Sequence, residues 1–267
     1  MGRLPEEVSA VGVVIGTSGW QYDDWKDVLY AGVPRARWLE HYASVFPAVE
    51  VNNTFYNLPS EKTFAGWAAR MPDGFVYVCK ASRFITHIRR LDDVAEPITR
   101  FVERASLLGE KLGPTLYQLP PSMPRDDEKL KKFLDVLPEH PPSALEFRND
   151  SWYDPAVFEP LREHDVALVV ADSPKHRAPI ELTASWSYFR LHGGEDEASY
   201  GDALGDWATR VGRFAGRADP VYVFFDNDTG GNAVIDALSL TAKVAALGVP
   251  VAPAPGGPPA GAEPAGS

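Results

Sequence analysis

The fold is indicated most clearly by residues 166–172, which read Val166-Ala-Leu-Val-Val-Ala-Asp172. Parallel strands are buried on both faces, so they appear in a sequence as continuous apolar runs. A charged side chain is costly inside such a strand but well placed at its carboxyl end. Eight runs share this pattern: Val11–Ser18, Ala48–Asn52, Phe75–Lys80, Thr115–Gln118, Ala144–Arg148, Val166–Asp172, Tyr188–His192 and Val221–Asp226.

Helical patterns occupy several of the gaps between these runs. Apolar side chains recur at three- and four-residue spacing in Arg35–Phe46, and Ser60 is placed to cap a helix over Glu61–Met71. Similar patterns cover Val94–Leu108, Asp127–Leu137 and Asn232–Leu247. Strands that alternate with helices predict a parallel sheet, and eight units in about 250 residues predict a single α/β domain, a TIM-like (β/α)₈ barrel.

Two segments depart from the repeating pattern. Ser173–Trp186 contains two prolines and shows no helical period, so we expect an irregular connection between strands 6 and 7 of the barrel. From Pro250 onward the chain is almost entirely Pro, Ala and Gly. The sequence therefore predicts a barrel over residues 1–249 and a disordered tail over residues 250–267.

Bulk composition limits the partners and the compartment. The net charge of −11, from 26 basic and 37 acidic residues, disfavours a surface that holds nucleic acid by general attraction. Cys79 is the sole cysteine, which excludes a disulfide framework. No apolar stretch approaches the roughly 20 residues needed to span a membrane, and Met1–Ser9 lacks the pattern of a secretory signal. We expect a cytoplasmic protein with no membrane partner.

The polar ends of the runs predict a ligand site at one face of the barrel, because active sites of such barrels lie at the carboxyl ends of the strands. Side chains two residues apart in a strand share a face. Glu50 therefore shares a face with Asn52, and Glu146 with Arg148. The same reasoning groups Tyr188, Arg190 and His192, and we expect them to meet Ser18, Lys80, Gln118, Asp172 and Asp226 from other strands.

Four of these residues are candidates for catalysis. Two carboxylates in one partly buried mouth can have their pKa values pushed apart, so Glu50 and Glu146 are predicted to act as acid and base. His192 can transfer a proton near neutral pH, and Lys80 can stabilise an anionic group or developing charge. A purely structural ion pair of Glu146 with Arg148 remains the alternative.

A second signal comes from the loops after the last two runs. His192-Gly-Gly194 and Asp226-Asn-Asp-Thr-Gly-Gly-Asn232 combine glycines with the start of a helix, where anions bind readily. Trp20 represents aromatic residues that could stack on a sugar or base, or else pack the loops. The predicted substrate-binding residues are Asn52, Gln118, Arg148, Asp172, Arg190, Gly193, Asp226, Asn227, Asn232 and Trp20.

The sequence leaves the cofactor open. Only six histidines are present and none has a paired metal-binding spacing. A divalent metal ion with mainly oxygen ligands is one alternative. Its ligands would be Glu50, Glu146, Asp172 and His192.

Several segments together resemble the YecE-like family (domain of unknown function 72). They are Gly16-Thr-Ser-Gly-Trp20, Glu50-Val-Asn-Asn-Thr-Phe-Tyr56, Lys80 with Ile85-Thr-His87 and Arg90-Leu91, Gly113-Pro114, Gln118-Leu-Pro-Pro121, Glu146-Phe-Arg-Asn149, Ala171-Asp-Ser173, Arg190-Leu-His-Gly193 and Phe225-Asp-Asn-Asp228. The resemblance runs in order from about residue 13 to residue 245. It implies a TIM-like barrel and carries no reaction with it.

These observations favour a hydrolase that uses acid–base chemistry on a phosphorylated or sugar-containing small molecule. The first alternative is a metal-assisted phosphodiesterase or nuclease, which rests on analogy between barrels alone. The second is a non-catalytic protein that binds a nucleic acid or a metabolite.

Overall fold

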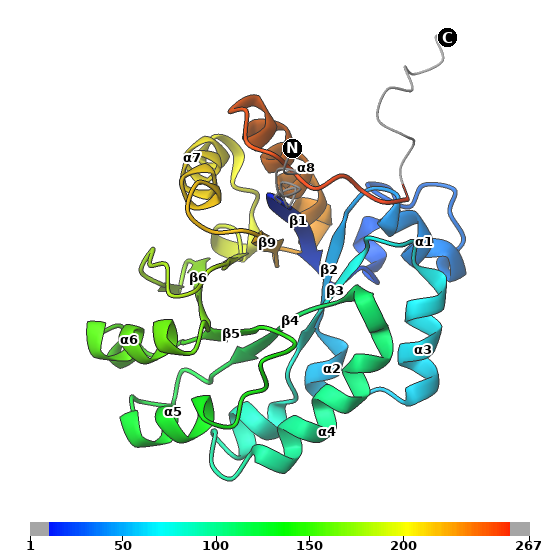
Figure 1. Cartoon of the computed structure of the whole chain (residues 1–267). Helices are drawn as coiled ribbons and strands as arrows, with labels where there is room; N and C mark the ends of the chain where they lie inside the picture. The colour runs from blue at the N-terminus through cyan, green and yellow to red at the C-terminus, as the bar shows by residue number, and fades with distance from the viewer. Residues whose placement is uncertain (1–10, 257–267) are drawn as a thin grey trace, which may run out of the picture.

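The computed structural model describes residues 11–256, which form a closed ring of parallel strands surrounded by helices (Figure 1). The ring strands are β1 (Val13–Ser18), β2 (Ala48–Val51), β3 (Val76–Lys80), β4 (Leu112–Gln118), β5 (Ser143–Glu146), β6 (Ala167–Ser173), β8 (Ser187–Leu191) and β9 (Val221–Phe225). Consecutive ring strands pair in parallel, β1 pairs with β9, and the pairing of β5 with β6 closes the ring. The predicted TIM-like barrel is confirmed, and each predicted run overlaps one ring strand.

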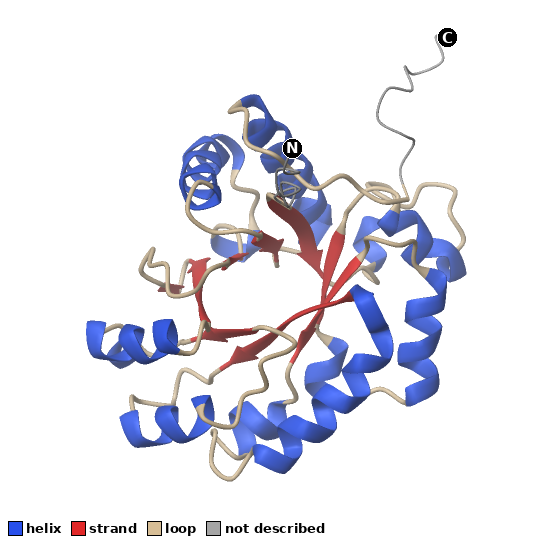
Figure 2. Cartoon of the chain, in the orientation of Figure 1, coloured by secondary structure: helices blue, strands red, loops and turns tan. Residues whose placement is uncertain are grey.

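Helices lie outside the ring and cover its outer face (Figure 2). They are α1 (Trp38–Ala43), α2 (Asn53–Tyr56), α3 (Glu61–Arg70), α4 (Ala95–Ala105), α5 (Asp127–Leu134), α6 (Pro155–Glu163), α7 (Leu204–Ala215) and α8 (Asn232–Ala246). The cap predicted for α3 is present, since Ser60 Oγ accepts a hydrogen bond of 3.2 Å from the Thr63 N–H. Helices α2, α6 and α7 are additional to the helical patterns found in the sequence.

The connection between β6 and β8 is irregular, as predicted. It contains no helix over residues 174–186 and instead forms the short strand β7 (His176–Arg177), which pairs antiparallel with β6 outside the ring. This hairpin stands where the other units place a helix. The barrel therefore has less cover at this point than elsewhere.

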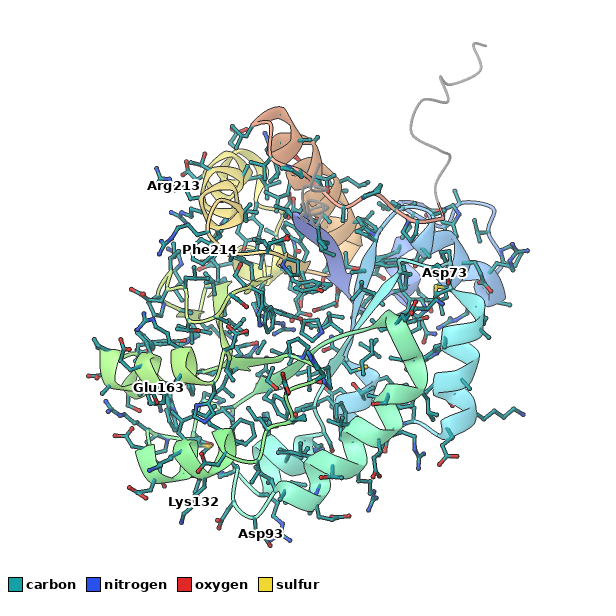
Figure 3. The ribbon with its side chains drawn as sticks, in the orientation of Figure 1. Asp73, Asp93, Lys132, Glu163, Arg213 and Phe214 are labelled. Carbon is teal, nitrogen blue, oxygen red and sulfur yellow. The ribbon has the colours of Figure 1, made fainter. Side chains whose placement is uncertain are left out.

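Two apolar layers fix which side chains reach the mouth of the barrel. One layer packs between the strands and the outer helices, and the other fills the ring itself, with Val14, Val78, Leu116 and Tyr188 among its members. Figure 3 shows that side chains occupy the interior of the ring. Residues an even number of positions after these inward members also face inward, which brings Ser18, Lys80, Gln118 and Arg190 to the carboxyl end.

The start of the predicted tail contacts the barrel. The Val13 N–H donates to the Pro250 carbonyl, the Ala252 N–H donates to the Val13 carbonyl, and Val251 forms a bridge with Val13. The structure therefore places residues 250–256 against the barrel, beyond the predicted boundary at residue 249. Residues 257–267, which hold the rest of the predicted tail, and Met1–Ser9 lie outside the described residues. Within residues 11–256, none of the helices has the length and apolar character required to cross a membrane.

Candidate active site

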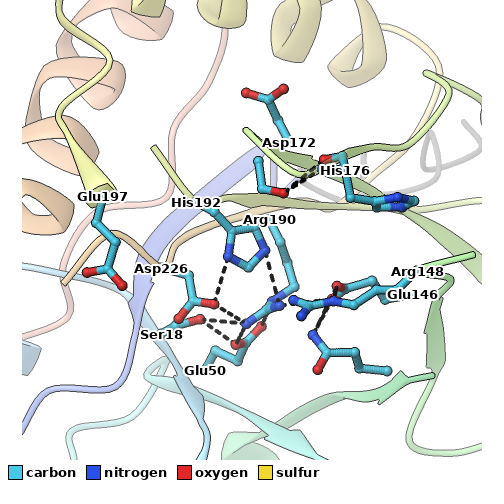
Figure 4. Close-up of polar contacts among 12 residues, drawn as sticks. Ser18, Glu50, Glu146, Arg148, Asp172, His176, Arg190, His192, Glu197 and Asp226 are labelled. Atoms are coloured by element: carbon cyan, nitrogen blue, oxygen red, sulfur yellow. Dashed lines mark hydrogen bonds and ion pairs between the residues drawn. The ribbon is translucent and has the colours of Figure 1, made fainter. Parts of the chain in front are cut away.

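Arg190, on β8, lies at the centre of the mouth and is wholly buried. It donates to three carboxylates (Figure 4). Its Nε and Nη2 contact Glu50 Oε2 and Oε1 at 2.9 and 2.8 Å, Nη1 contacts Glu146 Oε2 at 2.9 Å, and Nη2 contacts Asp226 Oδ2 at 2.8 Å. Burial alone would disfavour the charged form, but the three carboxylates raise the pKa of Arg190 well above its ordinary value. The guanidinium is a permanent cation that links β2, β5 and the loop that follows β9.

Glu50 is saturated by donors from several strands. Besides the two contacts from Arg190, Tyr188 Oη donates to its Oε2, and Ser18 Oγ donates to its Oε1. Burial and the charge of Glu50 raise the pKa of Tyr188 well above its ordinary value, so the phenol keeps its proton. Glu50 thus acts as an acceptor at the floor of the mouth, with its oxygens turned to fixed partners.

Glu146 is equally enclosed. Gln118 Nε2 lies 2.9 and 3.0 Å from its two oxygens, and Arg148 Nε donates to Oε1 at 2.7 Å. Burial opposes its ionisation, but the charges of Arg190 and Arg148 lower the pKa of Glu146 well below its ordinary value. Glu146 is therefore a carboxylate at neutral pH, which disfavours the acid role and leaves it as a base or a positioning group.

Lys80 and Arg148 keep donors available above this floor. Lys80 is 8% exposed, and burial together with the charge of Arg190 lowers its pKa to about 8. Its ammonium lies 4.5 Å from the centre of the Phe55 ring. Within residues 11–256, the only side-chain hydrogen bond that involves Lys80 is accepted by its backbone carbonyl from Thr54 Oγ1, and the Arg148 side chain donates only through Nε. The Lys80 ammonium and both Nη groups of Arg148 are free to hold a ligand.

His87 extends this cationic side of the mouth. Burial lowers the pKa of His87, and the charges of Lys80, Arg148, Arg83 and Arg90 act in the same direction. Arg83, His87 and Arg90 follow β3, and Arg148 follows β5, so these groups belong with Lys80 to the carboxyl-end face of the barrel. This basic side contrasts with the acidic net charge of the chain and was absent from the residues chosen from the sequence, apart from Lys80 and Arg148.

His192 and Asp226 form a pair on the other side of Arg190. His192 Nδ1 lies 3.0 Å from Asp226 Oδ2, and Arg190 Nη1 lies 3.4 Å from His192 Nε2. Arginine can only donate, so in the neutral ring Nε2 is the acceptor and Nδ1 carries the proton. Burial opposes the charge of Asp226, but Arg190 and His192 lower the pKa of Asp226. The carboxylate thereby orients the imidazole as a base.

Asp228 is a titratable group that the sequence reasoning left out of the site. Burial, with the nearby charge of Asp226, raises the pKa of Asp228 to about 8. Its Oδ1 is shielded from solvent and has no hydrogen-bond partner within the described range 11–256. Asp228 is therefore mostly protonated at neutral pH, close enough to Asp226 to be affected by its charge. The sequence does offer one indication that Asp228 belongs to the site, since it lies two residues after Asp226 in the loop that follows a strand.

Asp172 lies on the wrong face for the predicted cluster. The inward residues of β6 are Ala167, Val169 and Ala171, so Asp172 faces the outer layer. There it accepts from Tyr200 Oη at 2.9 Å and pairs with Arg177 Nε at 3.0 Å. Figure 4 shows Asp172 pointing away from Arg190.

The loops after β8 and β9 use their predicted ligand groups internally. Asn227 Nδ2 donates to Asp236 at 2.9 Å, and Asn232 Nδ2 donates to the Glu197 carbonyl at 3.1 Å. Gly193 has a φ of +78°, and a Cβ there would lie 2.5 Å from the Ala198 carbonyl oxygen, so glycine is required for close packing of the loop. Glu197 Oε2 accepts from the backbone N–H of Thr229 at 3.1 Å. A carboxylate thus already occupies the position predicted for phosphate, and the basic side near Lys80 is the better anion site.

Trp20 and Asn52 lie together at the neighbouring ends of β1 and β2. They line a groove of about 410 Å³ with Gly19, Tyr22 and Trp67. The structure therefore places these two predicted binding residues beside the charged cluster, in a separate depression.

The residues predicted to bind a metal ion are separated by a positively charged side chain. The Arg190 guanidinium stands between Glu50 and Glu146, and Asp172 faces away. In the part of the chain that the structure describes, no three His, Cys, Asp or Glu side chains are grouped so as to hold a metal ion. The predicted ligands Glu50, Glu146, Asp172 and His192 do not fit a divalent ion as arranged, and a metal-dependent reaction stays a prediction.

Sequence comparison identifies the family. The family model described as "Protein of unknown function DUF72" matches residues 14–259, and the chain belongs to this family. Among curated relatives, the UPF0759 protein YecE of Escherichia coli strain K12 is 25% identical over 238 residues, covering 79% of this chain and 85% of YecE. The UPF0759 protein YunF of Bacillus subtilis strain 168 is 25% identical over 257 residues, covering 83% and 90%.

Solved structures agree on the barrel. A DUF72 family protein from Thermotoga maritima MSB8 is similar with a TM-score of 0.80 and 29% identity, over 88% of this chain and 99% of that one. A DUF72 family protein from Enterococcus faecalis V583 is similar with a TM-score of 0.75 and 24% identity, over 87% and 95%. The names of these relatives state no reaction, so the residues at the mouth of the barrel are the only basis for a functional proposal.

Proposed function

We propose that this DUF72 protein is an enzyme that uses acid–base chemistry in the barrel mouth to hydrolyse an anionic, phosphate-containing substrate. The proposal is carried by one observation: the free donors of Lys80 and Arg148 stand over a floor that also holds an imidazole oriented by a carboxylate. Free cationic donors favour an anion, and an oriented imidazole favours proton transfer.

The roles follow from the charges of the groups. Lys80 and Arg148 bind the phosphate group, and Arg148 offers two Nη groups that match a pair of phosphate oxygens. His192, oriented by Asp226, removes a proton from the attacking water through Nε2, which the water reaches by replacing the long 3.4 Å contact from Arg190 Nη1. Asp228, whose pKa burial raises to about 8, returns a proton to the leaving group. These roles move the acid away from Glu50 and Glu146, which instead hold Arg190 and set the electrostatic field around Lys80.

The test is hydrolysis of the generic substrates p-nitrophenyl phosphate and bis(p-nitrophenyl) phosphate. We expect release of p-nitrophenol by the wild-type protein and a loss of roughly 100-fold or more in His192→Asn, because a positioned acid–base group contributes on that order. The matched control is His140→Asn, since His140 is exposed and precedes β5, at the opposite end of the barrel. Equal rates for His192→Asn and wild type would contradict the proposal. Addition of a chelator to the same assay separates the metal-assisted alternative, which requires that activity disappear.

A non-catalytic binding protein is the second candidate, and the saturation of Glu50 and Glu146 favours it. Every oxygen of these two carboxylates already accepts a hydrogen bond. Under this alternative, phosphate compounds bind at Lys80 and Arg148 but remain intact after long incubation, and His192→Asn binds them as wild type does.

A further inference from the structure

We infer that the groove beside the charged cluster is a carbohydrate subsite, so that the substrate is a phosphorylated sugar whose ring lies against Trp20, Tyr22 and Asn52. This inference rests on the proposed function for the phosphate end of the substrate and adds the chemistry of the other end. Its basis is a set of side-chain amides that have no partner within residues 11–256 and that lie beside aromatic side chains, in a depression close to Lys80.

The groove is built by the chain just after β1 and β2. Tyr22 Oη donates to the Ser18 carbonyl at 2.7 Å, which folds the ring back over the end of β1. Gly19 permits this, because its φ is +98° and a Cβ there would lie 2.7 Å from Tyr22 Oη. Trp20 packs edge-to-face on Trp67 with their ring centres 5.8 Å apart. The walls are therefore held in place before any ligand arrives.

Within residues 11–256, the amide side chains of the groove have no hydrogen-bond partners of their own. Asn52 Oδ1 is shielded from solvent and, in the described part of the chain, accepts no hydrogen bond. A buried acceptor left without a donor is destabilising, so a ligand that supplies a donor to it gains this contact at little desolvation cost. Gln21 and Asn53 line the same groove and are exposed, which adds two amides at its rim.

This lining matches a sugar better than a flat base. Trp20 and Trp67 are only 5% and 9% exposed, so they present narrow apolar edges rather than whole ring faces for stacking. A sugar ring needs only a small apolar contact for its C–H groups and many amides or hydroxyls for its O–H groups. The volume of about 410 Å³ also lies within the range of roughly 300–1,000 Å³ that is usual for small-ligand sites.

The groove is adjacent to the proposed phosphate site. In the parallel register Val51, the last residue of β2, pairs with Cys79. Asn52 and Lys80 each come directly after a residue of this pair, at the same end of neighbouring strands. Neighbouring strands are about 5 Å apart. One small molecule can therefore reach both the Asn52 amide and the Lys80 ammonium.

The experiment compares binding of three kinds of probe by saturation-transfer NMR and tryptophan fluorescence. The probes are neutral aldohexoses and aldopentoses, neutral nucleosides, and inorganic phosphate. We expect at least one aldose to bind wild type, at least tenfold weaker binding of it to Asn52→Leu, and unchanged binding of phosphate to that variant. Asn57→Leu is the matched control, because Asn57 is exposed and lies outside the groove, and Gln21→Ala gives a second variant at an exposed position with little risk to folding.

The possible outcomes distinguish the sugar subsite in the groove from the anion site of the proposed function. Phosphate binding without binding of any aldose would overturn the sugar subsite and leave the proposed function standing. Nucleoside binding that is lost in Asn52→Leu, with no aldose bound, would overturn it in favour of a base. Aldose binding that is equally strong in Asn52→Leu and Gln21→Ala would place the sugar elsewhere. Aldose binding without phosphate binding would support the groove and contradict the anion site instead.

Discussion

Arg190 and Glu50 form a two-point ion pair at the centre of the barrel mouth, with Nε to Oε2 at 2.9 Å and Nη2 to Oε1 at 2.8 Å, and neither side chain is exposed. A charge pair in such a place is costly unless every donor and acceptor is used. Here the pair joins β8 to β2, strands separated by β9 and β1 in the ring. This ion pair holds together the base of the barrel mouth, next to which the side chains of Lys80, His192 and Asp226 lie.

The first prediction concerns this central cation. Arg190→Met leaves Glu50, Glu146 and Asp226 without their shared partner, so we expect the free energy of unfolding at pH 7 to fall by about 3–5 kcal/mol. Urea denaturation measures it, with Arg213→Met as the control because Arg213 is exposed on α7 (Figure 3). A loss no larger than that of the control would show that the cluster is not structurally coupled.

The second prediction follows from the ionisation of Glu146. Its pKa is lowered in the folded state from the ordinary value of 4.5, although burial opposes this, because of the charges of Arg190 and Arg148. Below about pH 4.5, Glu146 becomes protonated in the unfolded chain but stays ionised in the folded chain. The free energy of unfolding therefore falls as the pH falls. Glu146→Gln lacks this contribution. We expect it to be less stable than wild type at pH 7 and the difference to narrow toward pH 3, whereas a constant difference would contradict the assignment.

The third prediction concerns Asp228, for which the sign is opposite. Burial raises its pKa from 3.8 to about 8, so between these values the folded chain keeps a proton that the unfolded chain has lost. Stability of the wild type therefore decreases as the pH rises through this window. Asp228→Asn removes the effect, and we expect it to gain up to roughly 1 kcal/mol per pH unit relative to wild type between pH 5 and pH 8. Parallel stability curves for the two proteins would show that Asp228 is ionised when folded.

The fourth prediction concerns the tautomer of His192. Because Asp226 accepts at Nδ1 and Arg190 approaches Nε2, the neutral ring carries its proton on Nδ1. ¹⁵N NMR of histidine-labelled protein reports the tautomer directly. We expect the Nδ1–H form in wild type and also in Asp226→Asn, because Arg190 can still only donate to Nε2. A wild-type ring protonated on Nε2 alone would remove the basis for its role as a base.

The sequence predicted the barrel because its strands carry the signal themselves. Each ring strand lies in a largely apolar run, with a polar residue at its last position or directly after it, and that pattern depends only on burial on both faces. Helix α6 contains Pro160 and begins with Pro155, which hides its helical period, although proline at the first turn of a helix is well tolerated. The strands could thus be predicted from their residue pattern. Helix α6 could be inferred only because a helix usually connects two parallel strands.

The site was predictable only as far as strand register was known. A polar residue lies two positions from each of Glu50, Glu146 and Arg190. This spacing indicates that the side chains in each pair lie on the same face of their strand. Asp172 was misplaced because the sequence does not show which parity of β6 faces inward. The free donors of Arg148 and the protonation of Asp228 depend on contacts between distant strands, and no local pattern reveals these.

Titration with inorganic phosphate tests the central claim of an anion site most directly. Isothermal calorimetry at pH 7 compares wild type with Lys80→Met, and with Lys243→Met as a control at an exposed position on α8. We expect at least tenfold weaker binding in Lys80→Met alone. Sulfate, which keeps its charge in this range, should bind wild type less tightly as the pH rises through about 8, because Lys80 then loses its proton. Equal phosphate affinity in all three proteins would contradict the account.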